Sequence, residues 1–151
     1  MSYDSKEDTL KHIGRVRELL DHCRSNLHKR MVYHDQSKLA SPEKEIFDEM
    51  TPKLAGSTYG SDEYKEFLKQ MKPALDSHYT YNSHHPEHYK DGINGMSLFD
   101  VLEMLMDWKA AGERHNNGSI ERSLEVNEKR FKISPDLHRI LRNTAVEMGW
   151  I

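Results

Sequence analysis

Apolar residues recur at helical spacing along most of the chain, and no segment shows the strict alternation of a half-buried β-strand. Over residues 7–21 the apolar positions fall on one helical face, at Leu10, Ile13, Val16, Leu19 and Leu20. A second apolar stretch carries Leu27, Met31 and Val32 and ends near His34-Asp35. The pattern therefore predicts an all-α protein.

Caps and breakers divide the rest of the chain into further helices. Ser41-Pro42 predicts a helix start, with proline in the first turn and apolar positions as far as Met50. Serines that precede other periodic segments predict four more helix starts, at Ser61, Ser97, Ser119 and Ser134. Breaks are expected at residues 51–61, 90–95 and 116–118, and the last helix is expected to end near Gly149.

Length and composition place the chain among water-soluble globular proteins. Its 151 residues are most simply one domain, 1–151, with 36% hydrophobic and 31% charged residues. The formal net charge of -3 gives no signal for nucleic-acid binding, and no apolar run approaches the ~20 residues of a membrane span. The single cysteine, Cys23, rules out an intramolecular disulfide and is expected to be a small buried helical residue. With a polar N-terminus that lacks a signal peptide, these features predict a cytoplasmic protein.

The dipeptide His34-Asp35 offers an imidazole nitrogen and a carboxylate oxygen, a pair that suits divalent transition metals. Such a doublet also occurs by chance. Here it has other candidate ligands around it, namely His12, His78, His84, His85, His88 and Asp107. A His-rich tract can be a solvated loop, but four histidines within residues 78–88 of a chain with 10 in total favour metal ligation.

His12 can join His34 only under one geometric condition. The 22 residues between them would span about 33 Å in one unbroken helix at 1.5 Å per residue. A turn near residues 21–26 would fold two antiparallel arms together and bring His12 to His34. A role for His12 as a ligand therefore requires a helical hairpin, which Asp21, His22, Ser25 and Asn26 make plausible.

The helix expected from Ser97 to about Glu113 has two distinct faces. Its apolar stripe is Leu98, Val101, Leu102, Leu105 and Trp108, and a second face stacks Asp100, Glu103 and Asp107. The acidic face is either solvated or compensated by a bound cation. Asp107 is the better ligand candidate, because Trp108-Lys109-Ala110-Ala111 follows it and indicates that this end is packed.

These residues resemble the motif of the HD-domain metal-dependent phosphohydrolase superfamily: a histidine on the first helix, an HD doublet ending the second, and an aspartate on a late helix. More closely, the chain resembles small uncharacterised HD-like proteins of phages and bacteria. The segments that carry this resemblance are His34-Asp35-Gln36-Ser37-Lys38, His84-His85-Pro86-Glu87-His88 and Met106-Asp107-Trp108-Lys109-Ala110-Ala111. It covers roughly residues 9–115. His84-His85 with Asp91-Gly92 is also similar to elements of HD-GYP phosphodiesterases, but no Gly-Tyr-Pro follows, so cleavage of cyclic di-GMP is not implied.

The resemblance implies an HD-domain-like helical bundle with a central metal site and phosphohydrolase activity on a nucleotide or nucleotide-like phosphoester. His12, His34, Asp35 and Asp107 would hold the first of one or two divalent ions (Mn, Co, Ni, Zn, Mg or Fe). A second ion or a phosphate would contact His78, His84, His85 and His88. The expected catalytic residues are Lys38, Arg15 and His85, which would offset charge on the phosphoryl oxygens. Two alternatives stay open, an HD-fold di-iron oxygenase and a non-catalytic metal-stabilised binding module. The expected partner is a small phosphorylated molecule rather than a membrane, and a homo-oligomer stays open as well.

Overall fold

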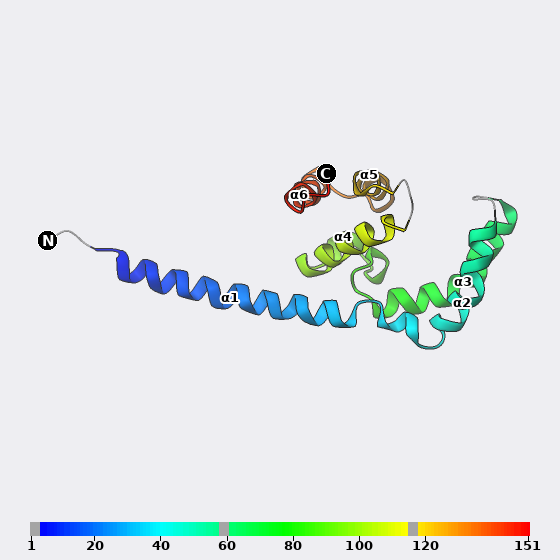
Figure 1. Ribbon diagram of the computed structural model, residues 1–151, viewed down its shortest axis with the longest axis horizontal. Coiled ribbons are helices and arrows are strands. Elements are labelled where there is room, and N and C mark those ends of the chain that lie inside the picture. Colours follow the sequence, from blue (N-terminus) through cyan, green and yellow to red (C-terminus); the bar gives the residue numbers. More distant parts are fainter. Residues whose placement is uncertain (1–3, 58–60, 115–117) are drawn as a thin grey trace. The chain divides into compact units, whose positions relative to one another are not determined.

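The computed structural model describes residues 4–57, 61–114 and 118–151, and every regular element in these ranges is helical (Figure 1). The prediction of an all-α protein is thereby confirmed for the described residues. The chain forms two compact units, Met1–His34 and Asp35–Ile151. The expectation of one domain over residues 1–151 stays a prediction.

The first unit is one long helix, α1, which spans Lys6–Tyr33 without interruption (Figure 1). The expected turn at residues 21–26 is wrong, because the polar residues there continue the helix. Arg24 and Asp21 form an ion pair at 2.7 Å across one helical turn. Residues expected to break the helix therefore interact along it. The expectation that Cys23 is buried is also wrong, since its side chain is exposed.

The second unit begins with the short 3₁₀ helix η1, Gln36–Leu39, and the helix pair α2, Glu43–Gly56, and α3, Asp62–Tyr81. The first residue of α2, Glu43, contacts His78 near the end of α3, so the two helices run antiparallel. The expected loop over residues 51–61 is wrong for its first part, because α2 continues through Pro52 to Gly56. An internal proline costs ~3 kcal/mol, and the packing of α2 on α3, where Met50 is only 2% exposed, offsets that cost. Residues 58–60 lie outside the described residues.

Two further 3₁₀ helices, η2 (Pro86–His88) and η3 (Gly92–Gly95), lead into α4, Leu98–Gly112. Helices α5, Ile120–Phe131, and α6, Pro135–Glu147, complete the chain. Four predicted serine caps are confirmed, because each hydroxyl accepts a hydrogen bond from a backbone N–H of the first helical turn (Ser61, Ser97, Ser119 and Ser134). The cap expected at Ser41 is wrong, because α2 begins at Glu43 with Pro42 in the N-cap position. The expected break at residues 116–118 falls largely outside the described residues.

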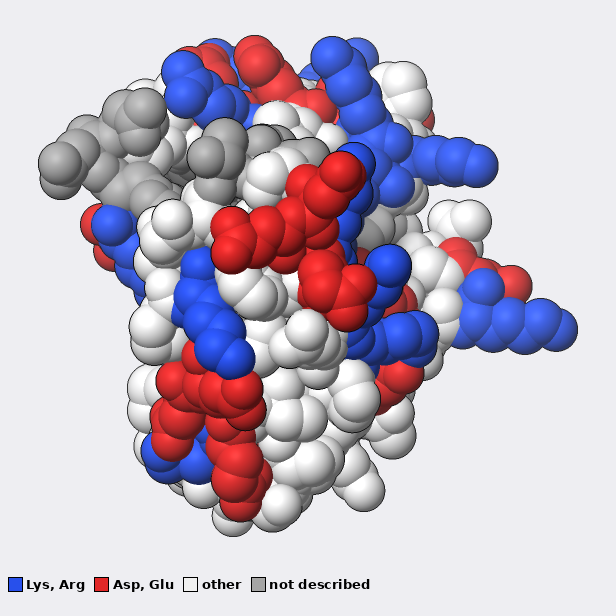
Figure 2. All heavy atoms as spheres, turned by 90° about the vertical axis from the view of Figure 1, so that its right-hand side faces the viewer, with Lys and Arg blue, Asp and Glu red and all other residues white. Residues whose placement is uncertain are grey.

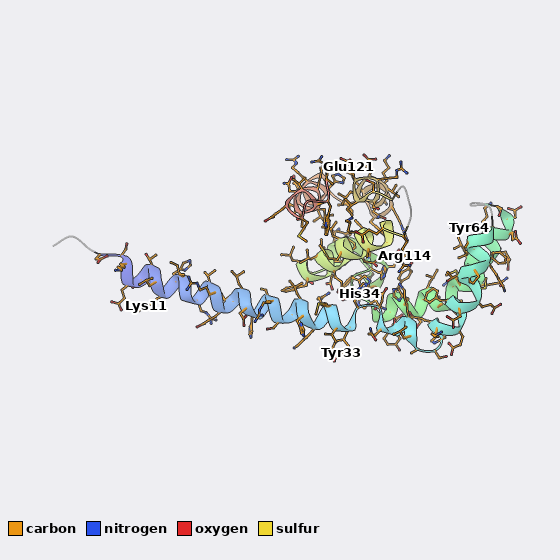
Figure 3. All side chains as sticks on the ribbon, in the orientation of Figure 1. Lys11, Tyr33, His34, Tyr64, Arg114 and Glu121 are labelled. Atoms are coloured by element: carbon orange, nitrogen blue, oxygen red, sulfur yellow. The ribbon has the colours of Figure 1, made fainter. Side chains whose placement is uncertain are left out.

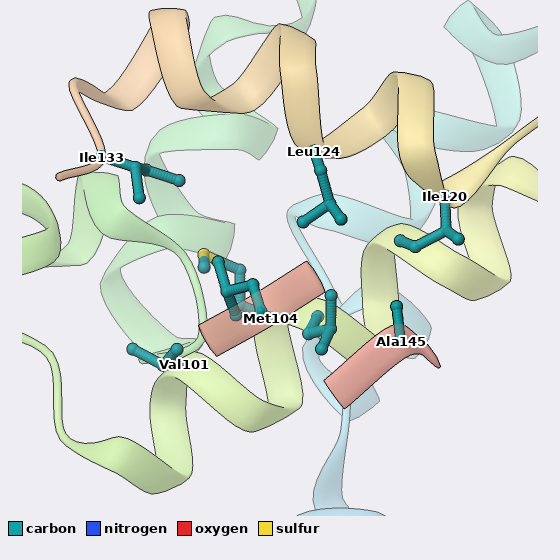
Figure 4. Packing of buried hydrophobic residues seen from close by; sticks show 8 residues of the cluster. Val101, Met104, Ile120, Leu124, Ile133 and Ala145 are labelled. Atoms are coloured by element: carbon teal, nitrogen blue, oxygen red, sulfur yellow. The ribbon is translucent and has the colours of Figure 1, made fainter. Parts of the chain in front are cut away.

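Helices α4, α5 and α6 enclose the main hydrophobic core (Figure 4). Its buried members are Val101, Met104, Leu105, Ile120, Leu124, Ile133, Leu141 and Ala145. Beside it, the rings of Trp108 and Phe131 stack with their centroids 6.2 Å apart. This core holds one face of α4 in place and thereby fixes its other side, which carries Glu103 and Asp107.

Charged side chains of both signs intermix on the face seen from the α2–α3 end (Figure 2). Charged residues of α3 pair along the helix, such as Lys72 with Asp76 at 2.5 Å and Lys65 with Asp62 at 3.3 Å. Exposed pairs of this kind contribute little to stability. Among the helices that the structure describes, none combines the length and apolar character needed to cross a membrane.

Candidate metal centre

Asp35 lies where the second unit begins, and its backbone adopts the left-handed conformation, with φ of 55°. Aspartate is one of the few residues with a side chain that visit this region readily. The conformation places Asp35 as the N-cap of η1 and leaves its side chain 19% exposed. The backbone conformation of Asp35 therefore fixes the direction in which its carboxylate points.

Three histidines converge on this carboxylate. His78 comes from the last turn of α3, and His84 and His85 come from the segment that joins α3 to η2. Asp35 Oδ1 lies 3.3 Å from His78 Nε2 and 3.5 Å from His84 Nε2, and the Nε2 atoms of His78 and His85 are 2.9 Å apart. One ligand atom from each of these four residues lies within 4.8 Å of the others.

Asp107 on α4 joins Asp35 and His84 in an overlapping group that meets the same 4.8 Å limit. We refer to Asp35, His78, His84, His85 and Asp107 together as the Asp35 cluster. Because Asp35 and His84 belong to both groups, the cluster can hold one ion or two neighbouring ions. Asp107 thus reaches the place that the sequence predicted for it.

The spacing of the ligand atoms fits a divalent transition metal. Nitrogen and carboxylate ligands lie about 2.0–2.2 Å from Zn²⁺. Adjacent ligands of one such ion are then separated by about 2.9 Å at a right angle and about 3.4 Å at a tetrahedral angle. The separations of 2.9, 3.3 and 3.5 Å between ligand atoms of the cluster fall in or next to this range. With no cysteine among them, the ligands favour a hard or borderline ion.

Carboxylates also lie behind two of the rings. His78 Nδ1 is 2.9 Å from Oε2 of Glu43, which is 1% exposed. His84 Nδ1 is 3.2 Å from Oε1 of Glu103, whose side chain is 14% exposed. Each of these rings therefore faces a carboxylate with Nδ1 and the Asp35 cluster with Nε2.

Burial favours the neutral form of two cluster histidines, His78 and His85. Burial, together with the neighbouring His84 and His78, lowers the pKa of His85 to about 3, while Asp107 and Asp35 oppose the shift. Burial also lowers the pKa of His78, although its hydrogen bond with Glu43 opposes that change. Neutral imidazole is the form that binds metals. His85 therefore suits a ligand better than the cation that would offset phosphate charge.

The acidic face of α4 separates into three different roles. Asp100 is 2% exposed and forms a capping box with Ser97. Burial raises the pKa of Asp100, but hydrogen bonds from Ser83, Ser97 and Tyr89 outweigh it and hold the pKa well below its usual range. Glu103 faces His84 and Asp107 belongs to the Asp35 cluster, so this face is not simply a solvated one.

Lys38 places a cation at the edge of the cluster. Its Nζ lies 2.5 Å from Asp35 Oδ2, and its side chain is 39% exposed. Because it sits three residues after Asp35 in η1, the single 3₁₀ turn brings its ammonium group back to the carboxylate. Lys38 thus borders the cluster and is also open to solvent.

Two expected site residues on α1, His12 and Arg15, are not brought to His34. Because α1 is unbroken, His12 and His34 stay about 33 Å apart along its axis, as the positions of Lys11 and His34 in Figure 3 illustrate. The hairpin that would join them is absent. Arg15 lies one turn from His12 and pairs with Glu18 at 2.7 Å, so it too is remote from His34.

His88 is another correction. Its Nδ1 hydrogen-bonds to the backbone carbonyl of Tyr79 at 2.8 Å, and the residue is exposed rather than part of either group. His34 is the C-cap residue of α1 and is bonded directly to Asp35. Its place as a ligand stays a prediction.

The structure also identifies residues that the sequence pattern did not single out. Glu43 reads as an ordinary acidic residue in a first helical turn, and Asn82 as part of a polar loop. In the structure Asn82 donates hydrogen bonds to Ser37 Oγ and to the carbonyl of His78, both at 2.8 Å. Both residues are almost fully buried, at 1% and 8% exposed. Only the tertiary packing reveals them.

Comparison with known families shows that the chain belongs to a family of unknown function, DUF5662, whose model matches residues 1–147. The match covers all of α1 and the second unit as far as residue 147. No curated protein and no solved structure matches the chain.

Proposed function

We propose that this protein is a metal-dependent phosphohydrolase that acts on a nucleotide or nucleotide-like phosphoester. The observation that carries the proposal is the Asp35 cluster, in which two carboxylates and three imidazoles from separate parts of the chain converge. Its order along the sequence, with the doublet at Asp35 and the late Asp107, is the order that resembles the HD-domain phosphohydrolases.

The donor set defines the chemistry that the site can support. A divalent ion held there would supply a Lewis acid for a phosphoryl oxygen and would lower the pKa of water towards ~7. The chain's own residues hold the ligand atoms at fixed positions, because they come from a 3₁₀ helix, an α-helix end and a short turn packed against one another. His34, next to Asp35 in the chain, is the further ligand that we propose.

Lys38 supplies positive charge at the edge of the cluster. When an ion occupies the carboxylate of Asp35, the ammonium group is released from part of its pairing and can attract an anionic phosphate. Its partial exposure allows a substrate to reach it from solvent. No glycine-rich phosphate loop stands out in the sequence, so phosphate recognition depends on the ion and this lysine.

The test is metal analysis followed by a substrate screen. Protein purified without chelators is assayed for bound metals and then loaded separately with Mn²⁺, Co²⁺, Ni²⁺, Zn²⁺, Mg²⁺ and Fe²⁺. Each form is tested on nucleoside monophosphates, triphosphates, cyclic nucleotides and a generic phosphodiester. Asp107→Asn should remove activity, whereas Asp62→Asn, a matched change at a fully exposed position of α3, should not.

Each outcome decides between the candidate functions. Hydrolysis that depends on metal and on Asp107 supports the proposal. Bound iron with a visible absorption band and no hydrolysis indicates an oxygenase. Tight metal binding without any reaction indicates a metal-stabilised binding module. The last two results would refute the phosphohydrolase proposal.

A further inference from the structure

Two glutamates stand directly behind the histidines of the Asp35 cluster. Glu43 comes from the first turn of α2 and Glu103 from the middle of α4, so the two are unrelated in sequence position. Each nevertheless meets the Nδ1 atom of one cluster histidine whose Nε2 faces Asp35. Two histidines next to Asp35 therefore each have a glutamate on the opposite side of the ring.

The hydrogen bonds around His78 fix the position of its proton. The Glu43 carboxylate lies 3.0 Å from each of the hydroxyls of Ser37 and Ser77, which donate to it, and 2.9 Å from His78 Nδ1. Asn82 Nδ2 is also 3.1 Å from His78 Nδ1. However, its two hydrogens are already directed to Ser37 Oγ and to the carbonyl of His78. Ser37 Oγ lies 3.4 Å from His78 Nδ1 as well, but its one hydrogen is directed to Glu43 at 3.0 Å. Because these donors are engaged elsewhere, His78 Nδ1 carries a hydrogen and donates it to Glu43.

A neutral imidazole with its proton on Nδ1 has its lone pair on Nε2. The lone pair on His78 Nε2 then faces Asp35 Oδ1 at 3.3 Å and lies beside His85 Nε2 at 2.9 Å. A cation bound between the lone pair and the carboxylate would relieve their repulsion. His84 has the same arrangement, with its Nδ1 atom 3.2 Å from Glu103 Oε1 and its Nε2 atom 3.5 Å from Asp35 Oδ1. Both rings are 2% exposed or less, which prevents them from turning freely.

We infer that Glu43 and Glu103 are positioning residues that hold His78 and His84 as Nδ1–H tautomers, with both Nε2 lone pairs directed at one divalent-cation site. This inference rests on the metal site of the proposed function and deepens it. A carboxylate behind a ligating imidazole fixes its orientation and raises its basicity, and loss of such a partner typically weakens metal binding 10–100-fold. Glu43 and Glu103 do not need to touch the ion or the substrate.

The first measurement reads the tautomers directly. In chelator-treated, ¹⁵N-histidine-labelled protein, long-range ¹H–¹⁵N correlation spectra should show His78 and His84 with the hydrogen on Nδ1. Single His→Gln variants assign the two rings. If either ring carries its hydrogen on Nε2 in the wild type, the inference fails for the glutamate behind that ring.

The second measurement compares metal affinities by competition with a chromogenic chelator, using Zn²⁺ and Co²⁺. Glu43→Gln and Glu103→Gln should each weaken binding about 10–100-fold. They should also change the Co²⁺ absorption spectrum. The matched controls are Glu45→Gln on α2 and Glu113→Gln at the end of α4, both at exposed positions, and these should change neither quantity.

Stability and activity are read separately from affinity. If Glu43→Gln lowers the unfolding midpoint of metal-free protein but leaves the affinity of the folded protein unchanged, Glu43 is merely structural and the inference is overturned. Glu103 is less buried, so its variant keeps the test open if Glu43→Gln does not fold. If wild-type protein shows the expected tautomers and affinities yet hydrolyses nothing, the phosphohydrolase proposal fails while the positioning role stands.

Discussion

Acidification of the metal-free protein should lower its stability through His85. The folded state holds the pKa of this ring to about 3, whereas in the unfolded chain it returns to 6.5. Between those values only the unfolded chain binds the proton. The stabilising contribution is therefore fully present above pH 6.5 and is lost progressively as the pH falls towards 3.

The size of the effect follows from the two pKa values. Between pH 7 and pH 5 the linkage relation gives a loss of about 2 kcal/mol for this single ring. His85 is only partly buried, so solvent screening reduces the expected loss to about 1 kcal/mol. The lowered pKa of His78 acts in the same direction and adds to the loss.

The assay is urea unfolding in the presence of a chelator at pH 7, 6 and 5, for the wild type and for His85→Gln. The variant has no ring to protonate, so its stability should fall by about 1 kcal/mol less over this range. Glu45→Gln, an exposed change on α2, serves as a control for general charge effects. Identical pH profiles for the wild type and His85→Gln would refute the reasoning.

Two further predictions concern the cluster and the core. Asp35→Asn keeps the shape of the side chain and tolerates the left-handed backbone, but it removes the carboxylate common to both ligand groups. Zn²⁺ affinity should therefore fall at least 100-fold, which exceeds the 10–100-fold loss typical when a residue behind a ligand is removed. Chelator competition measures this against Asp62→Asn, and equal affinities would show that Asp35 is not a ligand. Leu105→Ala should lower the free energy of unfolding by about 2–5 kcal/mol, because Leu105 is 1% exposed in the α4–α6 core. Chemical denaturation checks this value, and a loss below about 1 kcal/mol would mean that the core collapses around the gap.

Much of the local structure was predictable from the sequence because it depends on local interactions. The helical periodicity and the serine caps act within one or two turns, and Ser97 with Asp100 is a complete capping box. The failures came where longer-range effects decide. Polar residues at 21–26 pair along α1 rather than breaking it, and Pro52 stays within α2 because that helix packs on α3.

The candidate site divides in the same way. Asp35, His84 and Asp107 could be proposed from residue type and order, since metal ligands are drawn from a small set of side chains. His12 failed because its role depended on a hairpin that the chain does not form. Glu43 could not be found, because a glutamate in a first turn is common and only its burial behind His78 gives it a function.

The cluster also has a consequence for the chain as a polymer. Asp35 and Asp107 are 72 residues apart in the sequence, and closing a loop of that length costs about 4 kcal/mol of chain entropy. An ion bound by both residues would act as a reversible cross-link, as a disulfide does in secreted proteins. This chain has one cysteine and therefore cannot form an intramolecular disulfide. Local opening that separates η1 from α4 would then require release of the ion. The residence time of the metal, rather than the packing of the helices alone, would set how long the two ends of this loop stay together.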